Sequence, residues 1–179
     1  IGGHANMLYE QLTKNGFDVK KMEVPHIPIK NLKNPSFAIF SSLKGILSKE
    51  SFDIVHAFNV PSAFAMKYTK AKKKVLSIHG VYSEQVDALH SKTIYTAAKI
   101  TETKVLQWAD KLTTDSKIVK KMYKEKLNVD FEFFYAPLDI KKFENLKNIE
   151  KKENQIIQFL RHHTQLCRLE ELKVELQEM

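Results

Sequence analysis

The sequence predicts an α/β fold in which parallel strands alternate with helices that cover both faces of the sheet. Three observations predict it. Short apolar segments recur along the chain, and each is followed by a longer segment whose apolar residues have helical spacing. Glycine, proline and asparagine separate these segments. Apolar residues make up 43% of the chain and charged residues 28%, as in an ordinary folded domain. Because consecutive strand–helix–strand units imply right-handed crossovers, we predict a doubly wound parallel sheet.

The first part of the chain predicts a helix, a strand and a second helix. Residues 4–14 place apolar side chains near one helical face, and Asn15-Gly16 supplies a C-cap. Residues 17–24 alternate between apolar and polar, which is typical of a strand, and prolines follow them in a loop. Residues 36–47 return to helical spacing.

The next part repeats a strand–helix unit. We predict strands at residues 52–56, 74–79, 111–115 and 131–135. Pro61 begins the helix after the first of these strands, and a long helical region ends at Asp110. Ser116 caps a helix that runs to about residue 126.

We predict three parts in the chain. Residues 1–143 form the parallel-sheet domain, whose first strand is missing, and residues 144–154 form a charged linker. Residues 155–179 predict one strand and one helix, which cannot bury themselves and so form the incomplete start of a second domain. The chain opens with Ile-Gly-Gly-His in place of a Met and a leader, so we expect it to begin inside a larger gene product.

The composition indicates which binding partners and which cellular compartment to expect for this chain. The formal net charge is +8, but nearly all basic residues are lysines, and Arg161 and Arg168 are the two arginines. Since nucleic-acid binders interleave arginine with aromatic residues on a recognisable module, we expect no nucleic-acid partner. No segment approaches the roughly 18 apolar residues of a membrane span. The single cysteine, Cys167, excludes an internal disulfide and fits a cytoplasmic protein.

Unusual polar residues and glycines gather at the ends of the predicted strands. In open parallel sheets, ligands bind beyond the carboxyl ends of the strands, which share one edge. Glycines ahead of the first helix would let backbone N–H groups approach a phosphate. The residues of this edge are Gly2, Gly3, His56, His79, Gly80, Asp115 and Ser116.

Each of these residues also has a plainer explanation. His56 could simply be hydrogen-bonded at a strand end, Asp115-Ser116 could be a helix cap, and Gly2-Gly3 could be a flexible end. A histidine before a turn glycine, as at His79, fits ligand contact better. The pair His162-His163 lacks a third metal ligand at a useful spacing, so we expect no metal site. The sequence contains no nucleophile elbow and no P-loop, so the spacing predicts a ligand crevice without naming a reaction.

Several segments, in this order and spacing, resemble a known family. They are Gly2-Gly3 and residues 15–19, 52–57, 75–80, 102–116 and 134–143. The last segment places Pro137 and Asp139 ahead of Phe143, similar to the family's hinge signature. Together they resemble the N-terminal domain of the retaining glycosyltransferases of family 4, which have the two-domain GT-B fold.

The resemblance implies the Rossmann-like, acceptor-side half of such an enzyme, truncated at both ends. The full-length enzyme would transfer a sugar with retention from a nucleotide-sugar, such as a UDP- or GDP-sugar, to a lipid-linked or polysaccharide acceptor, with no other cofactor. His79 would hydrogen-bond the transferred sugar and act as the catalytic residue. Gly2 and Gly3 would contact the donor diphosphate, and His56 would face the acceptor. Gly80, Asp115 and Ser116 would complete the donor and acceptor site.

The chain departs from the family near its end. The family uses an arginine and a lysine of its second domain to stabilise the departing diphosphate. Arg161 could keep the first role, but Cys167-Arg168 stands where Lys-Gly is expected. We therefore expect the fragment alone not to turn over. The basic segment 117–124 would suit docking to an anionic membrane at the cytoplasmic face, or be an ordinary solvated helix.

Two alternatives remain open from the sequence. A nucleotide-sugar epimerase of the same fold would need carboxylates near His79 for proton transfer, and Glu84 and Asp87 are close in sequence. The other alternative is a Rossmann-like module that binds a phosphorylated ligand or a partner without catalysis.

Overall fold

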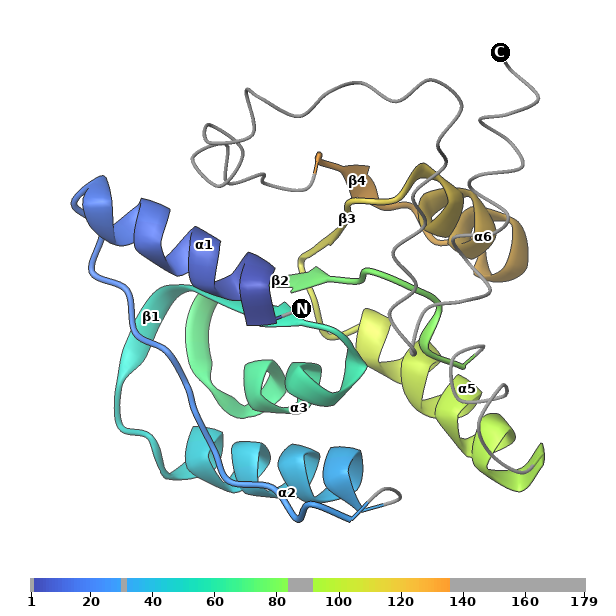
Figure 1. Cartoon of the computed structure of the whole chain (residues 1–179), viewed down its shortest axis with the longest axis horizontal. Coiled ribbons are helices and arrows are strands. Elements are labelled where there is room, and N and C mark those ends of the chain that lie inside the picture. The colour runs from blue at the N-terminus through green and yellow to red at the C-terminus, as the bar shows by residue number, and fades with distance from the viewer. Residues whose placement is uncertain (1, 30–31, 84–91, 136–179) are drawn as a thin grey trace, which may run out of the picture. The chain divides into compact units, whose positions relative to one another are not determined.

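The described part of the chain forms a four-stranded, all-parallel sheet in the order β1-β2-β3-β4, flanked by helices (Figure 1). The computed structural model describes residues 2–29, 32–83 and 92–135. The strands are β1 (Ser51–Phe58), β2 (Lys70–Ser77), β3 (Lys111–Thr114) and β4 (Glu132–Phe133). The helices are α1 (Gly2–Lys14), α2 (Lys33–Leu47), α3 (Val60–Tyr68), α5 (Lys92–Leu106) and α6 (Lys117–Leu127). The predicted α/β class with parallel strands is confirmed.

The predicted boundaries shift mainly at the second strand. β2 begins at Lys70 and ends at Ser77, whereas the apolar pattern predicts residues 74–79. The lysine-rich start of β2 pairs with β1 through its backbone, from the pair Ser51–Lys70 onward. Because ladder hydrogen bonds need no apolar side chain, a polar strand start gives no hydrophobic signal. Pairing also carries β1 on to Phe58, so His56 lies inside the strand and not at its end.

The predicted strand over residues 17–24 is wrong. These residues form no strand in the structure, and the Phe17 side chain is 61% exposed. A strand requires a neighbour for its backbone N–H and C=O groups, and no described strand lies alongside this segment. Side chains of other segments hold it instead: Lys44 Nζ donates to the carbonyl of Glu23 at 2.8 Å.

The hydrophobic core lies between the sheet and its crossover helices. Ala57 of β1 and Leu76 of β2 pack with Met66 of α3 and Val105 of α5, and all four are buried. Helix α1 lies on the opposite side of β1 and β2 from α3 (Figure 1). None of the α1 side chains whose burial is described is buried, so α1 contributes little to this core.

Helix α2 packs mainly against α3. The two helices approach closely at Gly45, where an added Cβ would lie 3.0 Å from Thr69 Oγ1 and 3.2 Å from the carbonyl oxygen of Ala65. The predicted helix at 36–47 is confirmed, and it begins at Lys33. The predicted C-cap of α1 is also confirmed, since Gly16 has a positive φ of 84°.

Candidate functional site

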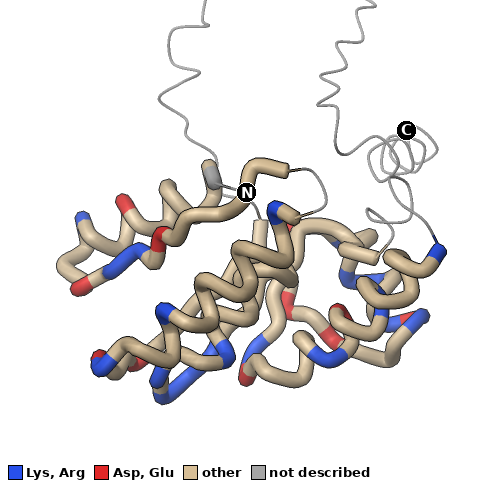
Figure 2. Tube along the Cα trace, turned by 90° about the horizontal axis from the view of Figure 1, so that it is seen from below, with Lys and Arg blue, Asp and Glu red and all other residues tan. Residues whose placement is uncertain are grey.

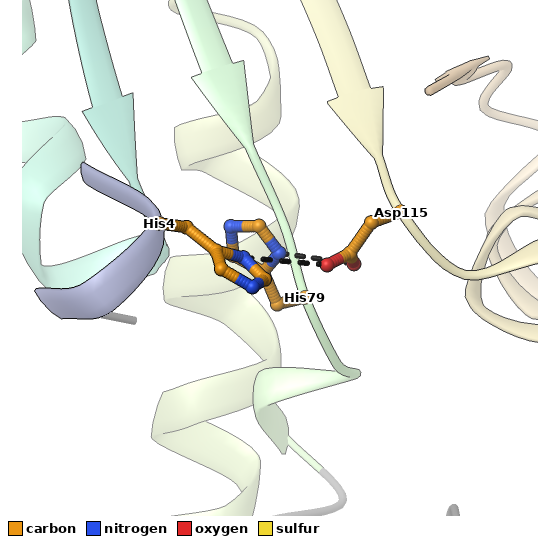
Figure 3. Close-up of side chains that lie close together, drawn as sticks. All are labelled: His4, His79 and Asp115. Carbon is orange, nitrogen blue, oxygen red and sulfur yellow. Dashed lines mark ion pairs between the residues drawn. The ribbon is translucent and has the colours of Figure 1, made fainter. Parts of the chain in front are cut away.

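The carboxyl ends of β2 and β3 bring His79 and Asp115 together (Figure 3). β2 ends two residues before His79, and β3 ends at the residue before Asp115, so parallel pairing delivers both to one edge. His79 Nδ1 lies 2.9 Å from Asp115 Oδ1, and the two side chains are 17% and 18% exposed. Sequence reasoning placed both residues at this edge, and the structure brings them into contact.

His4 of α1 completes the cluster, and sequence reasoning missed it. Its Nδ1 lies 3.5 Å from Asp115 Oδ2, and its ring meets that of His79 edge-on with centroids 5.2 Å apart. The available signal was its position directly after Gly3, at the start of the helix expected to begin at this edge. The missed residue therefore lies beside the glycines that the sequence had singled out.

The glycines and Ser116 occupy ordinary structural positions at the same edge. Gly2 and Gly3 form the first turn of α1, where a loop was expected. A Cβ added at Gly3 would meet no atom within 4 Å, so the space beside it is open. Gly80 is buried directly behind His79. Ser116 is the N-cap of α6, as predicted, because its Oγ accepts from the Val119 N–H at 3.2 Å.

His56 lies inside β1, set back from the carboxyl edge of the sheet. It belongs to a row of polar side chains that runs across β1, β2 and β3. Its Nε2 is 2.7 Å from Ser77 Oγ, which in turn is 2.6 Å from Thr113 Oγ1. The Phe58 ring is stacked with His56 and with His79, with centroids 4.3 Å and 6.1 Å away. Burial, helped by the charge of His79, lowers the pKa of His56 to about 4. His56 is therefore a neutral, hydrogen-bonded group at neutral pH.

Electrostatics within the cluster favour an ionised Asp115. Burial alone would raise the pKa of Asp115, but the hydrogen-bonding contact and charge of His79, with smaller contributions from its own backbone and from His4, lower it overall. The pKa of His4 is lowered, first by burial and then by the charge of His79, although Asp115 opposes this. The carboxylate is thus the one anionic group of the three.

Glu102 of α5 fixes the segment that follows His79 and Gly80. It is 2% exposed, and its carboxylate accepts from the backbone N–H of Tyr82 at 2.7 Å and of Ser83 at 3.2 Å. It also accepts from the Tyr123 hydroxyl of α6. Sequence reasoning missed this residue because a glutamate in a helix gives no sign of burial.

A pocket of about 330 Å³ lies beside Glu102. Its lining includes Tyr95, Lys99 and Met122 but neither His79 nor Asp115. The cluster at the carboxyl edge and this pocket are therefore separate features. The cluster is the candidate site, because it lies at the carboxyl edge, where open parallel sheets bind ligands.

The charged surface does not single out one face. Figure 2 shows lysines on several elements, interspersed with acidic residues. On α6, Lys121 pairs with Glu125 at 3.9 Å and Lys124 with Asp130 at 2.7 Å. No helix among the described residues combines the length and the apolar content needed to span a bilayer.

Other residues singled out from the sequence lie outside the described residues. They are Glu84, Asp87, the hinge residues Pro137, Asp139 and Phe143, the linker and second-domain start, Arg161, and the pair His162-His163. Their expected roles stay predictions.

Comparison with known protein families gives a match over most of the chain. The family model described as Glycosyltransferase Family 4 matches residues 3–140, which is well over half of the 179-residue chain. The matched residues include His4, His79 and Asp115. No curated protein and no solved structure matches the chain.

Proposed function

The chain belongs to Glycosyltransferase Family 4, and from that premise we propose that it is part of an enzyme that transfers a sugar, with retention, from a nucleotide-sugar donor to a glycan or lipid-linked acceptor. The observation that carries this proposal is the contact between His79 and Asp115 at the carboxyl edge of a parallel sheet. That edge is where open α/β sheets bind ligands.

His79 is the residue proposed to contact the transferred sugar. Within the described residues, its Nε2 is buried and has no hydrogen-bond partner. A buried nitrogen without a partner is unfavourable by about 1–3 kcal/mol, so a sugar hydroxyl that reached it would gain that interaction. Asp115 holds the other side of the ring and fixes its orientation. In this role His79 positions the sugar and is not a nucleophile.

The start of α1 is proposed to receive the donor diphosphate. The first N–H groups of a helix have no intrahelical partner and carry partial positive charge, which suits an anion. The open space beside Gly3 supports an approach of phosphate oxygens to this turn. Gly80 and Ser116 line the same edge. Arg161, outside the described residues, is proposed to add positive charge to the departing diphosphate.

The acceptor is proposed to enter over β1. His56 is hydrogen-bonded to Ser77 and would support the acceptor side through the stacked ring of Phe58. Exposed lysines on α6, such as Lys117, suit contact with an anionic lipid surface that carries a lipid-linked acceptor.

Ligand-detected saturation-transfer NMR tests the proposal. UDP-glucose and GDP-mannose are added separately to the wild type, to His79→Ala and to His26→Ala. His26→Ala is the control, because it replaces an exposed histidine that is distant from His79 in the sequence. We expect saturation of the sugar protons of one donor with the wild type and with His26→Ala, and at least a tenfold weaker affinity for His79→Ala.

Four results would count against the proposal. Absence of binding for both donors would overturn the donor contacts proposed for this half of the enzyme, and unchanged binding by His79→Ala would move the site elsewhere. Interconversion of the donor sugar during incubation, seen as new anomeric signals, would favour the epimerase alternative. Binding of free UDP or GDP equal to that of the donors, with no contact to the sugar, would favour a non-catalytic module.

A further inference from the structure

Asn59, between the end of β1 and the start of α3, has a backbone conformation that residues other than glycine avoid. Its φ and ψ angles are 71° and 164°. Steric contact with the Cβ atom makes this region almost exclusive to glycine, so an asparagine here is strained. Strained residues persist where the surrounding structure holds them, and they cluster at functional sites.

We propose that Asn59 is a positioning residue for the sugar that binds at His79. Its side-chain oxygen holds the backbone of His79, and its amide nitrogen donates a hydrogen bond to an oxygen of the donor sugar. This inference rests on the proposed function and adds a residue that the strand-end pattern of the sequence did not single out.

Helix capping explains the other positive φ that the described residues contain outside glycine. Asn128 is the C-cap of α6, with φ and ψ of 52° and 36°, the left-handed region that asparagine adopts at helix ends. Its N–H donates to the carbonyl oxygens of Lys124 and Tyr123. Asn59 is the N-cap of α3, yet its side chain makes no capping hydrogen bond. Capping therefore accounts for Asn128 and not for Asn59.

Main-chain contacts hold Asn59 in its strained conformation. Its N–H donates to the carbonyl oxygen of Ser77 at 2.8 Å, just beyond the paired residues of β1 and β2. Its carbonyl oxygen accepts from the Ser62 N–H at 3.2 Å and from the Ser62 hydroxyl at 2.9 Å. The next residue, Val60, is buried in the core. The sheet and α3 together therefore fix the position of the Asn59 side chain.

The Asn59 side chain reaches the turn that contains His79. Its Oδ1 accepts from the backbone N–H of His79 at 3.4 Å. Because a backbone N–H only donates, the amide oxygen takes this position and the amide nitrogen remains for another partner. Asn59 is half-buried, and no residue in the described ranges accepts a hydrogen bond from that nitrogen. Water can occupy this position in the free chain, and a ligand oxygen can replace it.

The groups beside Asn59 fit a sugar better than a phosphate. The amide is a neutral donor, and the adjacent Phe58 ring is stacked with His79. His79 Nε2 is buried without a partner among the described residues. The carboxylate of Asp115 lies against the same imidazole ring, and its negative charge disfavours an anion there. A few placed polar groups beside an aromatic ring are typical of sites for small polar ligands.

Asn59→Gly separates strain from binding, because the two effects have opposite signs. Glycine adopts the observed φ and ψ without strain, so we expect the Tm of the full chain to rise by about 2–4 °C. Glycine has no amide, so saturation-transfer titration should show at least tenfold weaker affinity for the donor that the wild type binds, UDP-glucose or GDP-mannose. A purely structural asparagine would show the rise in Tm without the loss of affinity.

Asn59→Asp tests the direct contact with the sugar. Aspartate keeps an oxygen for the His79 N–H and nearly the same shape, but it has no N–H to donate. We expect an unchanged Tm and a weaker affinity for the donor. Free UDP or GDP is the ligand control, because a charge effect would weaken its binding equally, whereas loss of a sugar contact leaves it unchanged.

Asn128→Gly is the matched control, since it makes the same exchange at the other positive φ. It should bind the donor like the wild type. The inference is overturned if Asn59→Gly keeps wild-type affinity, if the Asn59 variants weaken free nucleotide as much as the donor, or if Asn128→Gly loses as much affinity. A wild type that binds neither donor would overturn the proposed donor contacts as well, whereas equal binding by the wild type and Asn59→Gly overturns this inference alone.

Discussion

His79 Nδ1 and Asp115 Oδ1 lie 2.9 Å apart although the two residues come from different strand ends. Parallel pairing of β2 with β3 produces this contact, because it sends both chain segments out of the same edge of the sheet.

Replacing the carboxylate tests the orienting role of Asp115. Asp115→Asn keeps the shape of the side chain but removes the negative charge beside the His79 ring. We expect nucleotide-sugar affinity to fall about tenfold or more, while the free energy of unfolding changes by less than about 1 kcal/mol. Saturation-transfer titration and urea unfolding measure the two quantities. If the free energy of unfolding fell by as much as the binding free energy, Asp115 would have a structural role alone.

Gly3→Ala separates close approach of a ligand from helix stability. An added Cβ meets no protein atom within 4 Å, and alanine is favoured over glycine in a helix by up to about 1 kcal/mol. We expect unchanged or higher stability in urea unfolding, together with weaker donor binding, because the methyl group would occupy the space proposed for phosphate. Donor binding as strong as that of the wild type would contradict the proposed diphosphate position.

Removing the Glu102 carboxylate should destabilise the segment behind His79. Glu102→Ala removes the acceptor of two backbone N–H groups and of one buried hydroxyl, and the loss of such a hydrogen bond to a buried group is worth about 1–3 kcal/mol. We expect a loss of roughly 3 kcal/mol or more in the free energy of unfolding. Tyr123→Phe, which removes only one donor, serves as the matched comparison and should lose less. A loss no larger than that of Tyr123→Phe would show that the backbone contacts contribute little.

The polar row across the sheet predicts a pH dependence of stability. The pKa of His56 is about 4 in the folded chain, against 6.5 for a histidine without these contacts, as in the unfolded chain. Between those values the unfolded chain binds a proton that the folded chain does not. Above pH 6.5 His56 is neutral in both states, so it does not change the free energy of unfolding. As the pH drops from 6.5 towards 4, the free energy of unfolding falls by about 3 kcal/mol in total.

Urea unfolding of the wild type and of His56→Gln across this pH range measures that effect. The variant cannot take up the proton, so the difference between the two pH profiles isolates His56 from other groups. Parallel profiles would mean that His56 titrates normally in the folded chain.

A methyl group between α2 and α3 should be poorly tolerated. Gly45→Ala places a Cβ 3.0 Å from Thr69 Oγ1 and 3.2 Å from the backbone oxygen of Ala65. Since a helix backbone cannot rotate away like a flexible side chain, we expect a loss of about 1–3 kcal/mol in the free energy of unfolding. Thermal unfolding measures it. Gly3→Ala, which meets open space, is the contrasting glycine substitution.

Apolar pattern and order of elements were enough to predict the parallel sheet and its shared edge. β1 and β3 carry apolar side chains that pack on the core, such as the buried Ala57 and the partly buried Leu112, so their positions are visible in the sequence. The lysine-rich start of β2 has no apolar pattern that would predict a strand, because only its backbone takes part in pairing. Residues 17–24 have the alternation of a strand, but alternation does not supply a neighbour to pair with.

The sequence also predicted only part of the candidate site. His79 and Asp115 follow strand ends, which the apolar pattern reveals, so their convergence was predictable. His4 was missed because it begins the predicted helix over residues 4–14 and follows no predicted strand, so the strand-end pattern did not single it out. Glu102 was missed because side-chain burial depends on packing between α5 and α6, and a single helix sequence does not contain that information.

The side chains that converge at the edge of the sheet are different from those that build the hydrophobic core. Neither His4, His79 nor Asp115 belongs to the cluster of Leu76, Met66 and Val105. Selection can therefore exchange the edge residues for others without repacking the interior. One scaffold of this kind can acquire a new ligand preference through a few substitutions, and stability and specificity can change at separate positions during evolution.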